Sequence, residues 1–324
     1  MISVLAVLVV VWGVMACWTA LGWVVYRSDS VWLRRVLLVC MVAVAASMPI
    51  WLWEHSDWAR GISTLPMFLL IAKTWELGVR RLSDGIDFQH VGHLAVWTYA
   101  VPEGHWPIDS ERRAQCRKRV GPRAIRVSLK LVAFLGLLAV NEYVSFQHIR
   151  SVQLVWMGFV VYVFFSGVRD AVALGWGAIG VDVIPMFDAP PLARNPRDFW
   201  GRRWNLWFTK LSQRLIFEPL GGRNRPILAS GAVFVASAFL HEVIASVGLQ
   251  QLDGRMTVFF LAHMVGTMVF TQIDHRWPNR LPRMVAVPLH FAWLMCTAGW
   301  FLDPMNEFIF LSKWTISSAV DFLL

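Results

Sequence analysis

Residues 227–248 read Ile-Leu-Ala-Ser-Gly-Ala-Val-Phe-Val-Ala-Ser-Ala-Phe-Leu-His-Glu-Val-Ile-Ala-Ser-Val-Gly. A helix needs about 20 predominantly apolar residues to cross a bilayer, and this stretch is long enough. It also carries a histidine and a carboxylate side by side, His241 and Glu242, well inside the apolar run. A charged side chain at mid-bilayer costs roughly 2.5 to 3.5 kcal/mol on insertion scales. The stretch therefore predicts a transmembrane helix that holds polar residues for a functional reason.

The rest of the chain repeats the apolar pattern. Of its 324 residues 57% are hydrophobic, and the mean hydropathy is +0.52. Each span must satisfy its own backbone hydrogen bonds in lipid, so helices are expected, and no alternating strand pattern indicates a barrel. The prediction is an all-α, polytopic membrane protein in one domain, 1–324, with about nine transmembrane helices. The expected spans are 1–25, 34–52, 62–78, 127–143, 151–168, 227–248, 256–273, 284–302 and 306–324.

Charged residues and cysteines refine this picture. Lys73, Glu76 and Lys130 interrupt the third and fourth expected spans. The first span lacks a basic leader and a small-residue cleavage pattern, so we expect it to remain as a mature helix. The four cysteines show no paired spacing, which predicts neither a disulfide framework nor a cysteine metal site.

The distribution of basic residues gives an orientation. When loops are assigned alternately to two sides, one side collects 24 of the 30 lysines and arginines, whereas the other holds only Arg60, Arg150 and Arg255. The positive-inside rule then places the long loops in the cytoplasm and the N-terminus outside. Most of the net charge of +9 is explained by this orientation and by contact with anionic headgroups. The pattern has no signature of nucleic-acid binding.

Two cytoplasmic segments are too long to be simple connectors. The first, 79–126, carries a basic cluster and is expected to lie on the surface. In the second, 178–226, Asn195 and Pro196 suit a helix N-cap and first turn. A helix is expected over 196–217, where aromatic and basic residues alternate as in an amphipathic interfacial helix before the sixth span.

Two motifs in this region resemble a known family. Residues 199–205 read Phe-Trp-Gly-Arg-Arg-Trp-Asn, and residues 237–242 read Ser-Ala-Phe-Leu-His-Glu. In this order the motifs resemble the signature of the membrane-bound O-acyltransferase superfamily, most closely its wax synthase-like branch. The second motif has Ala238 where glycine is usual, which leaves the close helix packing there in question. The resemblance covers about 190–245.

The resemblance implies transfer of an acyl group from a coenzyme A thioester to an alcohol, in a direct ternary complex. His241 would be the general base on the acceptor hydroxyl. Asn205 would donate its amide to the thioester or the developing oxyanion. Glu242, Trp204 and Ser237 are expected to support this site. No permanently bound cofactor and no metal are implied, and acyl-CoA is the co-substrate.

Basic and aromatic residues beside the first motif are candidates for binding acyl-CoA. Arg202 and Arg203, with Arg197, could bind the phosphates of coenzyme A by charge-assisted hydrogen bonds. The alternative is a basic helix face on lipid headgroups. Trp200 could line the thioester channel, although interfacial anchoring explains a tryptophan equally well.

Two rival functions stay open. His263 and His290 lie in the next two spans, so three consecutive helices carry an imidazole that could ligate haem or another metal. The structural explanation is that both histidines form hydrogen bonds between helices. A non-catalytic lipid transporter is the second rival, although the sequence lacks the symmetric broken helices expected of one.

The acceptor is not determined by these residues. A fatty alcohol, a sterol or a terpenoid would all suit an apolar tunnel, and membrane lipids are the other expected partners. The expected location is a bacterial inner membrane or the endoplasmic reticulum, with the signature loop in the cytoplasm.

Overall fold

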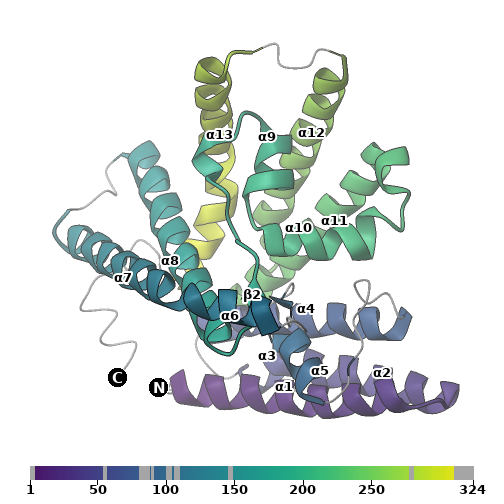
Figure 1. Cartoon of the computed structure of the whole chain (residues 1–324). Coiled ribbons are helices and arrows are strands. Elements are labelled where there is room, and N and C mark those ends of the chain that lie inside the picture. Colours follow the sequence, from purple (N-terminus) through teal and green to yellow (C-terminus); the bar gives the residue numbers. More distant parts are fainter. Residues whose placement is uncertain are drawn as a thin grey trace.

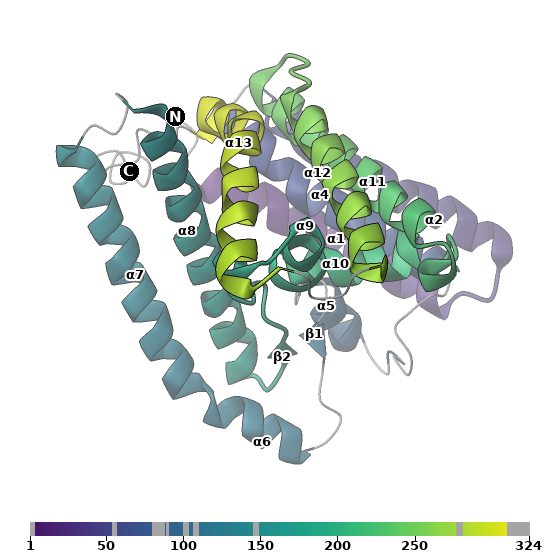
Figure 2. The same ribbon diagram turned by 90° about the horizontal axis from the view of Figure 1, so that it is seen from above.

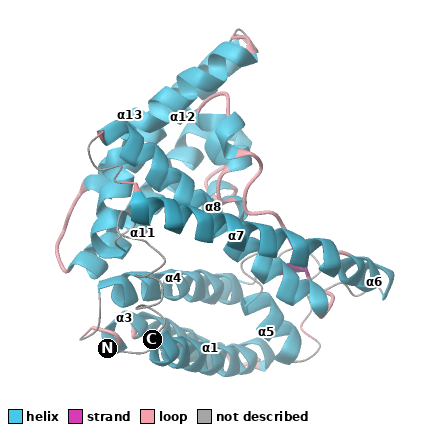
Figure 3. Cartoon of the chain, turned by 90° about the vertical axis from the view of Figure 1, so that its left-hand side faces the viewer, coloured by secondary structure: helices cyan, strands magenta, loops and turns pink. Residues whose placement is uncertain are grey.

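A computed structural model describes residues 4–53, 57–79, 88, 91–99, 104–105, 110–144, 149–276 and 281–309. Helices make up nearly all of these ranges (Figure 3), so the predicted helical class is confirmed. The long helices are α1 (Val4–Arg27), α2 (Val31–Ala46), α4 (Asp57–Val79), α7 (Val120–Tyr143), α8 (Arg150–Ala178), α11 (Pro226–Leu249), α12 (Arg255–Arg276) and α13 (Arg283–Ile309). The shorter helices are α3 (Met48–Trp51), α5 (Val91–Tyr99), α6 (Ser110–Lys118), α9 (Pro196–Asp198) and α10 (Leu206–Ser212). Two short strands, β1 (Gly104–His105) and β2 (Asp182–Val183), pair in an antiparallel manner.

Seven helical stretches are long and apolar enough to cross a membrane. They coincide with seven of the nine expected spans, and they identify the chain as an integral, multi-pass membrane protein. The expected third span is helical as α4, but its charged residues keep it out of this set. Most of the expected ninth span, 306–324, lies outside the described residues. The predicted number of nine transmembrane helices is therefore not confirmed.

The N-terminal helices pack as one unit. In Figure 1, α1, α2 and α4 run side by side in the lower part of the view, with α5 beside them. Their shared core contains Trp18, Met41, Leu70 and Trp97, all at most 5% exposed. On its other side α4 packs along α11, so it joins this unit to the rest of the molecule.

The C-terminal helices surround the segment that carries the first motif. Seen from above in Figure 2, α9 and α10 lie between α8, α11, α12 and α13. Helix α9 packs against α12, and α11 packs against both α12 and α13. Helix α7 packs against α8 at the edge of the molecule, and α8 packs in turn against α13.

The prediction of a single helix over 196–217 is wrong. The structure divides this range into α9, a π-helical turn at Phe199–Arg203, α10 and a second π-helical turn at Gln213–Phe217. The break falls at Asn205, whose backbone is left-handed with φ +44°. A residue in that conformation cannot continue a right-handed helix. The interfacial role of this range is not established.

The three arginines assigned to the sparsely charged side meet at one end of the bundle. Arg60 donates to the carbonyls of Val247 and Gly248 at the end of α11. Arg255 begins α12, and both Arg255 and Arg150 pair with acids of α13. The assignment of loops alternately to two sides requires these three arginines to lie at the same end. Which end faces the cytoplasm stays a prediction.

Candidate functional site

The first motif is introduced by the expected cap. The Asn195 side chain accepts a hydrogen bond of 2.8 Å from the Asp198 N–H, and Pro196 occupies the first helical position. The Asp198 carboxylate then binds the Arg203 Nε at 2.8 Å. Arg203 also donates through Nη1 to the carbonyls of Asp188 and Ala189. The arginine thus fastens the π-helical turn to the loop before it.

Trp200 is fixed by a buried hydrogen-bond chain that crosses two helices. Its indole N–H donates to Nδ1 of His263 on α12 at 3.0 Å. Because Nδ1 accepts, the neutral His263 ring carries its proton on Nε2 and donates to the Thr297 hydroxyl on α13, also at 3.0 Å. That hydroxyl donates in turn to the Trp293 carbonyl. His263 is fully buried, and both of its nitrogens are satisfied.

Asn205 ends one element and begins the next. Its Oδ1 accepts a 3.2 Å hydrogen bond from the Phe208 N–H and so caps α10. Asparagine tolerates the left-handed backbone better than most residues because its short polar side chain bonds locally. The side-chain amide Nδ2 takes no part in the cap. Trp204, just before it, stacks on Phe199 at a centroid distance of 5.3 Å.

His241 lies in a cage of aromatic rings. Its ring centroid is 4.4 Å from that of Phe260 on α12 and 5.7 Å from that of Phe301 on α13. Its Nδ1 lies 2.8 Å from the Ser237 carbonyl oxygen one turn earlier. A carbonyl oxygen can only accept, so Nδ1 carries the proton and Nε2 of the neutral ring is left as the basic nitrogen. Ser237 contributes through its main chain.

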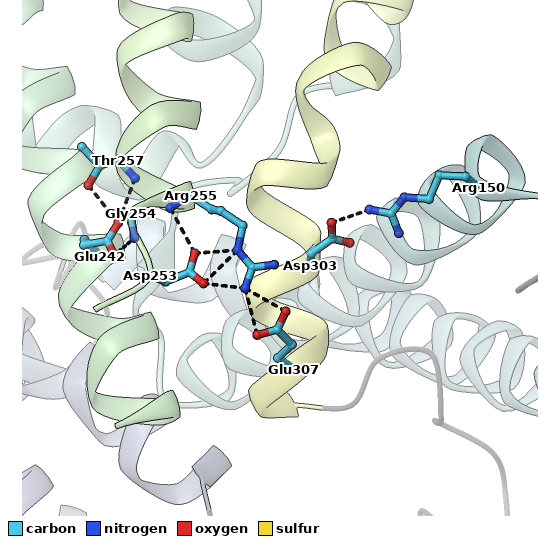
Figure 4. Close-up of polar contacts among 8 residues, drawn as sticks. All are labelled: Arg150, Glu242, Asp253, Gly254, Arg255, Thr257, Asp303 and Glu307. Atoms are coloured by element: carbon cyan, nitrogen blue, oxygen red, sulfur yellow. Dashed lines mark hydrogen bonds and ion pairs between the residues drawn. The ribbon is translucent and has the colours of Figure 1, made fainter. Parts of the chain in front are cut away.

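Glu242 points away from this cage and caps the neighbouring helix. One carboxylate oxygen accepts from the Gly254 N–H at 2.6 Å. The other accepts from the N–H and the hydroxyl of Thr257, at 3.0 and 2.8 Å (Figure 4). A carboxylate at a helix N-terminus is stabilised by the unpaired N–H groups and the helix dipole. Glu242 therefore holds the loop between α11 and α12.

An ion network extends this cap across the end of the bundle (Figure 4). Arg255 binds both oxygens of Asp253 and both oxygens of Glu307 on α13. Arg150 on α8 pairs with Asp303, one turn before Glu307. The hydrogen bonds from Arg255 lower the pKa of the Asp253 carboxyl. Four helices are thus joined at this end.

His290 differs from His263. It is 4% exposed, lies 5.5 Å from Phe199 by ring centroids, and finds no hydrogen-bond partner for either nitrogen among the residues that the structure describes. Hydrogen bonding between helices is therefore confirmed for His263 and wrong for His290. Both nitrogens of His263 are already used, which does not suit the ligation by three imidazoles considered above. In the ranges that the structure describes, no three His, Cys, Asp or Glu side chains are grouped to hold a metal.

The structure brings only some of the candidate residues together. Trp200 and His241 both contact Phe260, so the two motifs share one aromatic cluster. The Asn205 side chain bonds the Phe208 N–H rather than His241. Arg197 and Arg202 are exposed.

One link to the site could not be found from the motifs. Glu76 on α4 is 1% exposed and accepts from Nε and Nη2 of Arg214, in the second π-helical turn, at 3.0 and 2.9 Å. Lys73 pairs with the other Glu76 oxygen at 3.4 Å and lies over the Trp97 ring. This buried group connects the N-terminal unit to the end of the 196–217 segment. The only signal in the sequence is the charge inside an otherwise apolar helix.

The part of the chain that matches a known protein family includes most of the site described above. Residues 183–262 match the model of the membrane bound O-acyl transferase family. The matched range runs from β2 to the first half of α12 and contains both motifs, Phe260 of the aromatic cage and the Glu242 cap, whereas Phe301 of the cage lies outside it. The resemblance to this family is confirmed over that range.

Individual relatives agree with the wax synthase-like branch. The chain is 34% identical over 140 residues to acyl-CoA--sterol O-acyltransferase 1 of Arabidopsis thaliana, covering 39% of this chain and 40% of that protein. It is 29% identical over 196 residues to a long-chain-alcohol O-fatty-acyltransferase of Simmondsia chinensis, covering 54% and 53%. A probable long-chain-alcohol O-fatty-acyltransferase 3 of Arabidopsis thaliana is 28% identical over 193 residues, covering 55% and 56%. The chain thus spans about half the length of the relatives it matches.

Proposed function

We propose that this chain is an acyl-CoA-dependent O-acyltransferase that esterifies a lipidic alcohol. The observation that carries the proposal is the His241 ring. Its Nδ1–H is tied to the Ser237 carbonyl, its Nε2 is left as the basic nitrogen of a ring packed against Phe260, and both residues lie inside the range that matches the acyltransferase family. The names of the relatives supply the substrate classes, an acyl-CoA with a sterol or a long-chain alcohol.

The proposed reaction is one direct transfer. Nε2 of His241 removes the proton of the acceptor hydroxyl while the oxygen attacks the thioester carbonyl carbon. The tetrahedral intermediate then collapses, the carbon–sulfur bond breaks, and the coenzyme A sulfur leaves with the proton that the imidazolium returns. An ester and free coenzyme A result, and no acyl-enzyme forms.

Asn205 is the proposed donor to the oxyanion. Its Oδ1 is held by the Phe208 N–H, which fixes the direction of the Nδ2 amide. One such donor can contribute about 3 to 4 kcal/mol to the transition state. Arg197 and Arg202 are the proposed contacts for the coenzyme A phosphates. Arg203 is proposed to shape the turn on which they stand, because three of its hydrogen bonds go to the protein itself.

The remaining features are proposed on the same basis. The signature loop faces the cytoplasm, where acyl-CoA is available, and the N-terminus faces the opposite side. Lipidic acceptors, among them fatty alcohols, sterols and terpenoids, would enter from the bilayer.

A purified, reconstituted sample tests the proposal. It is incubated with labelled acyl-CoA and a panel containing a long-chain alcohol, a sterol and a terpenoid alcohol, and esters are identified by mass spectrometry. We expect one class to be esterified with stoichiometric release of coenzyme A, and His241→Ala made in parallel to form at least about a hundredfold less ester in the same time. Ester formation by neither sample with any alcohol would contradict the proposal, as would equal formation by both.

A further inference from the structure

One face of α6 lines a wide-open surface cavity of about 600 Å³, and most of its lining residues are exposed. The lining residues are Ser110, Arg113, Ala114, Arg117 and Lys118. Their spacing of three, four, seven and eight residues from the first places all of them on a single side of the helix. The cavity therefore meets two guanidinium groups, an ammonium group and a hydroxyl, and Ala114 leaves room between them.

None of the described residues that line this cavity is acidic. Residues 110–126 contain seven lysines and arginines and a single acid, Glu111, which does not line the cavity. The nearby Asp182 pairs instead with Arg123 at 3.1 Å and with Arg119 at 4.0 Å. Arg113 and Arg117 lie four residues apart on the same helix face, so an anion in the cavity would be attracted to both.

Part of the cavity wall is held in place before any ligand binds. The aliphatic stem of Arg113 packs over Gly180, where a Cβ atom would come within 3.0 Å of the Arg113 Cγ. Gly180 also has φ +88°, a conformation that favours glycine. A side chain that is already ordered loses less entropy when it binds a ligand.

The position of α6 identifies the anion. Helix α6 leads into α7, and Arg113–Asn141 is one of the candidate membrane spans. Because this candidate span begins at Arg113, we expect the cavity to lie where the span leaves the bilayer, near the lipid phosphates. Basic clusters beside a span attract anionic lipids, and guanidinium groups bind phosphate oxygens with two parallel hydrogen bonds.

We propose that this cavity binds the headgroup of an anionic phospholipid. Arg113, Arg117 and Lys118 contact its phosphodiester, and the Ser110 hydroxyl donates a further hydrogen bond. The site is independent of acyl transfer and of the residues assigned to it.

Lipid retention tests the site in the full chain. Wild-type protein is titrated with phosphatidylglycerol or phosphatidylcholine, and bound lipid is counted by native mass spectrometry. We expect one phosphatidylglycerol to bind about tenfold more tightly than phosphatidylcholine, a difference of about 1.4 kcal/mol. The variant Arg117→Gln/Lys118→Gln, whose altered side chains are exposed, should lose this preference.

A charge-matched control separates a site from general attraction. Arg35→Gln/Arg126→Gln removes two exposed charges that do not line the cavity, and should keep the preference. Equal loss in both double variants, or no preference in the wild type, would overturn the proposal. Displacement of the bound lipid by free coenzyme A would also overturn it, because the cavity would then bind the donor's phosphates.

Discussion

His241 and Glu242 are neighbours in the chain but belong to two different regions. The cage around His241, formed with Phe260 and Phe301, leaves one ring nitrogen unused. The cap around Glu242 uses both carboxylate oxygens in three hydrogen bonds to Gly254 and Thr257. Consecutive helix residues point about 100° apart, so one faces the aromatic interior and the other faces the α11–α12 loop. One short motif thus contains a residue arranged for chemistry and a residue arranged for structure.

After His241 itself, the largest effect is expected at the proposed oxyanion donor, which would act with the cage. Asn205→Asp keeps an oxygen for the Phe208 N–H and tolerates the left-handed backbone, but it loses the amide donor. We expect ester formation to fall roughly 10² to 10³-fold, with the thermal midpoint little changed. Initial rates and melting curves check this. The control Asn224→Asp, an exposed asparagine, should keep wild-type turnover. Wild-type rates for Asn205→Asp would exclude the donor role.

A smaller effect, on stability rather than rate, is expected at the cap. Glu242→Ala leaves two partly buried main-chain N–H groups and a hydroxyl without this acceptor. Each hydrogen bond to a charged group contributes about 1.5 to 3 kcal/mol, so the thermal midpoint should fall by several degrees. The remaining folded protein should keep most of its turnover. The exposed Glu218→Ala provides the matched control. Loss of turnover with an unchanged midpoint would show that Glu242 belongs to the chemistry.

Removing the hydrogen bonds that link Trp200, His263 and Thr297 is expected to have a weaker effect on stability. Trp200→Phe removes the donor to Nδ1 of His263, and Thr297→Val removes the acceptor for Nε2–H. Each should destabilise by about 1 to 3 kcal/mol. Because both bonds fix one tautomer, the double variant should depart from additivity by about 0.5 kcal/mol or more, measured by denaturant titration. Trp300→Phe, at an exposed position, should be nearly silent. Strict additivity would refute the coupling through His263.

The smallest effect is expected in the ion network, and it depends on pH. The folded-state pKa of Asp253 is lowered, so its contribution to stability is present above the ordinary value of about 3.9 and is lost as pH falls through the folded pKa. Asp253→Asn should lower the thermal midpoint at pH 7 by roughly 2 to 4 °C, for about 1 kcal/mol. The difference from wild type should shrink below about pH 4. A difference that stays constant between pH 7 and pH 3 would contradict the sign of this shift.

Much of the scaffold could be predicted from local patterns. Apolar length identified the spans, and Asn195 with Pro196 identified a cap, because both signals depend on neighbouring residues. The break at Asn205 was missed because the aromatic and basic pattern continues past it. A left-handed residue whose side chain caps the next helix leaves no mark in hydropathy.

Sequence analysis identified residues of the candidate site better than it identified what each residue does. The motifs indicated His241 and Glu242, but the partners of Glu242 are the N–H groups of Gly254 and Thr257 and the Thr257 hydroxyl, which no sequence pattern reveals. The contact between Arg214 and Glu76 joins residues 138 positions apart. A single sequence without its fold gives no means to pair them.

The most direct measurement is the rate of ester formation by purified His241→Ala, with Ser237→Ala beside it. Ser237→Ala removes a hydroxyl but keeps the carbonyl that fixes the His241 tautomer. Removing a general base typically costs about 10² to 10⁴-fold in rate. The account predicts a loss of that size for His241→Ala with an intact thermal midpoint, and near wild-type turnover for Ser237→Ala. Wild-type turnover by His241→Ala would contradict it.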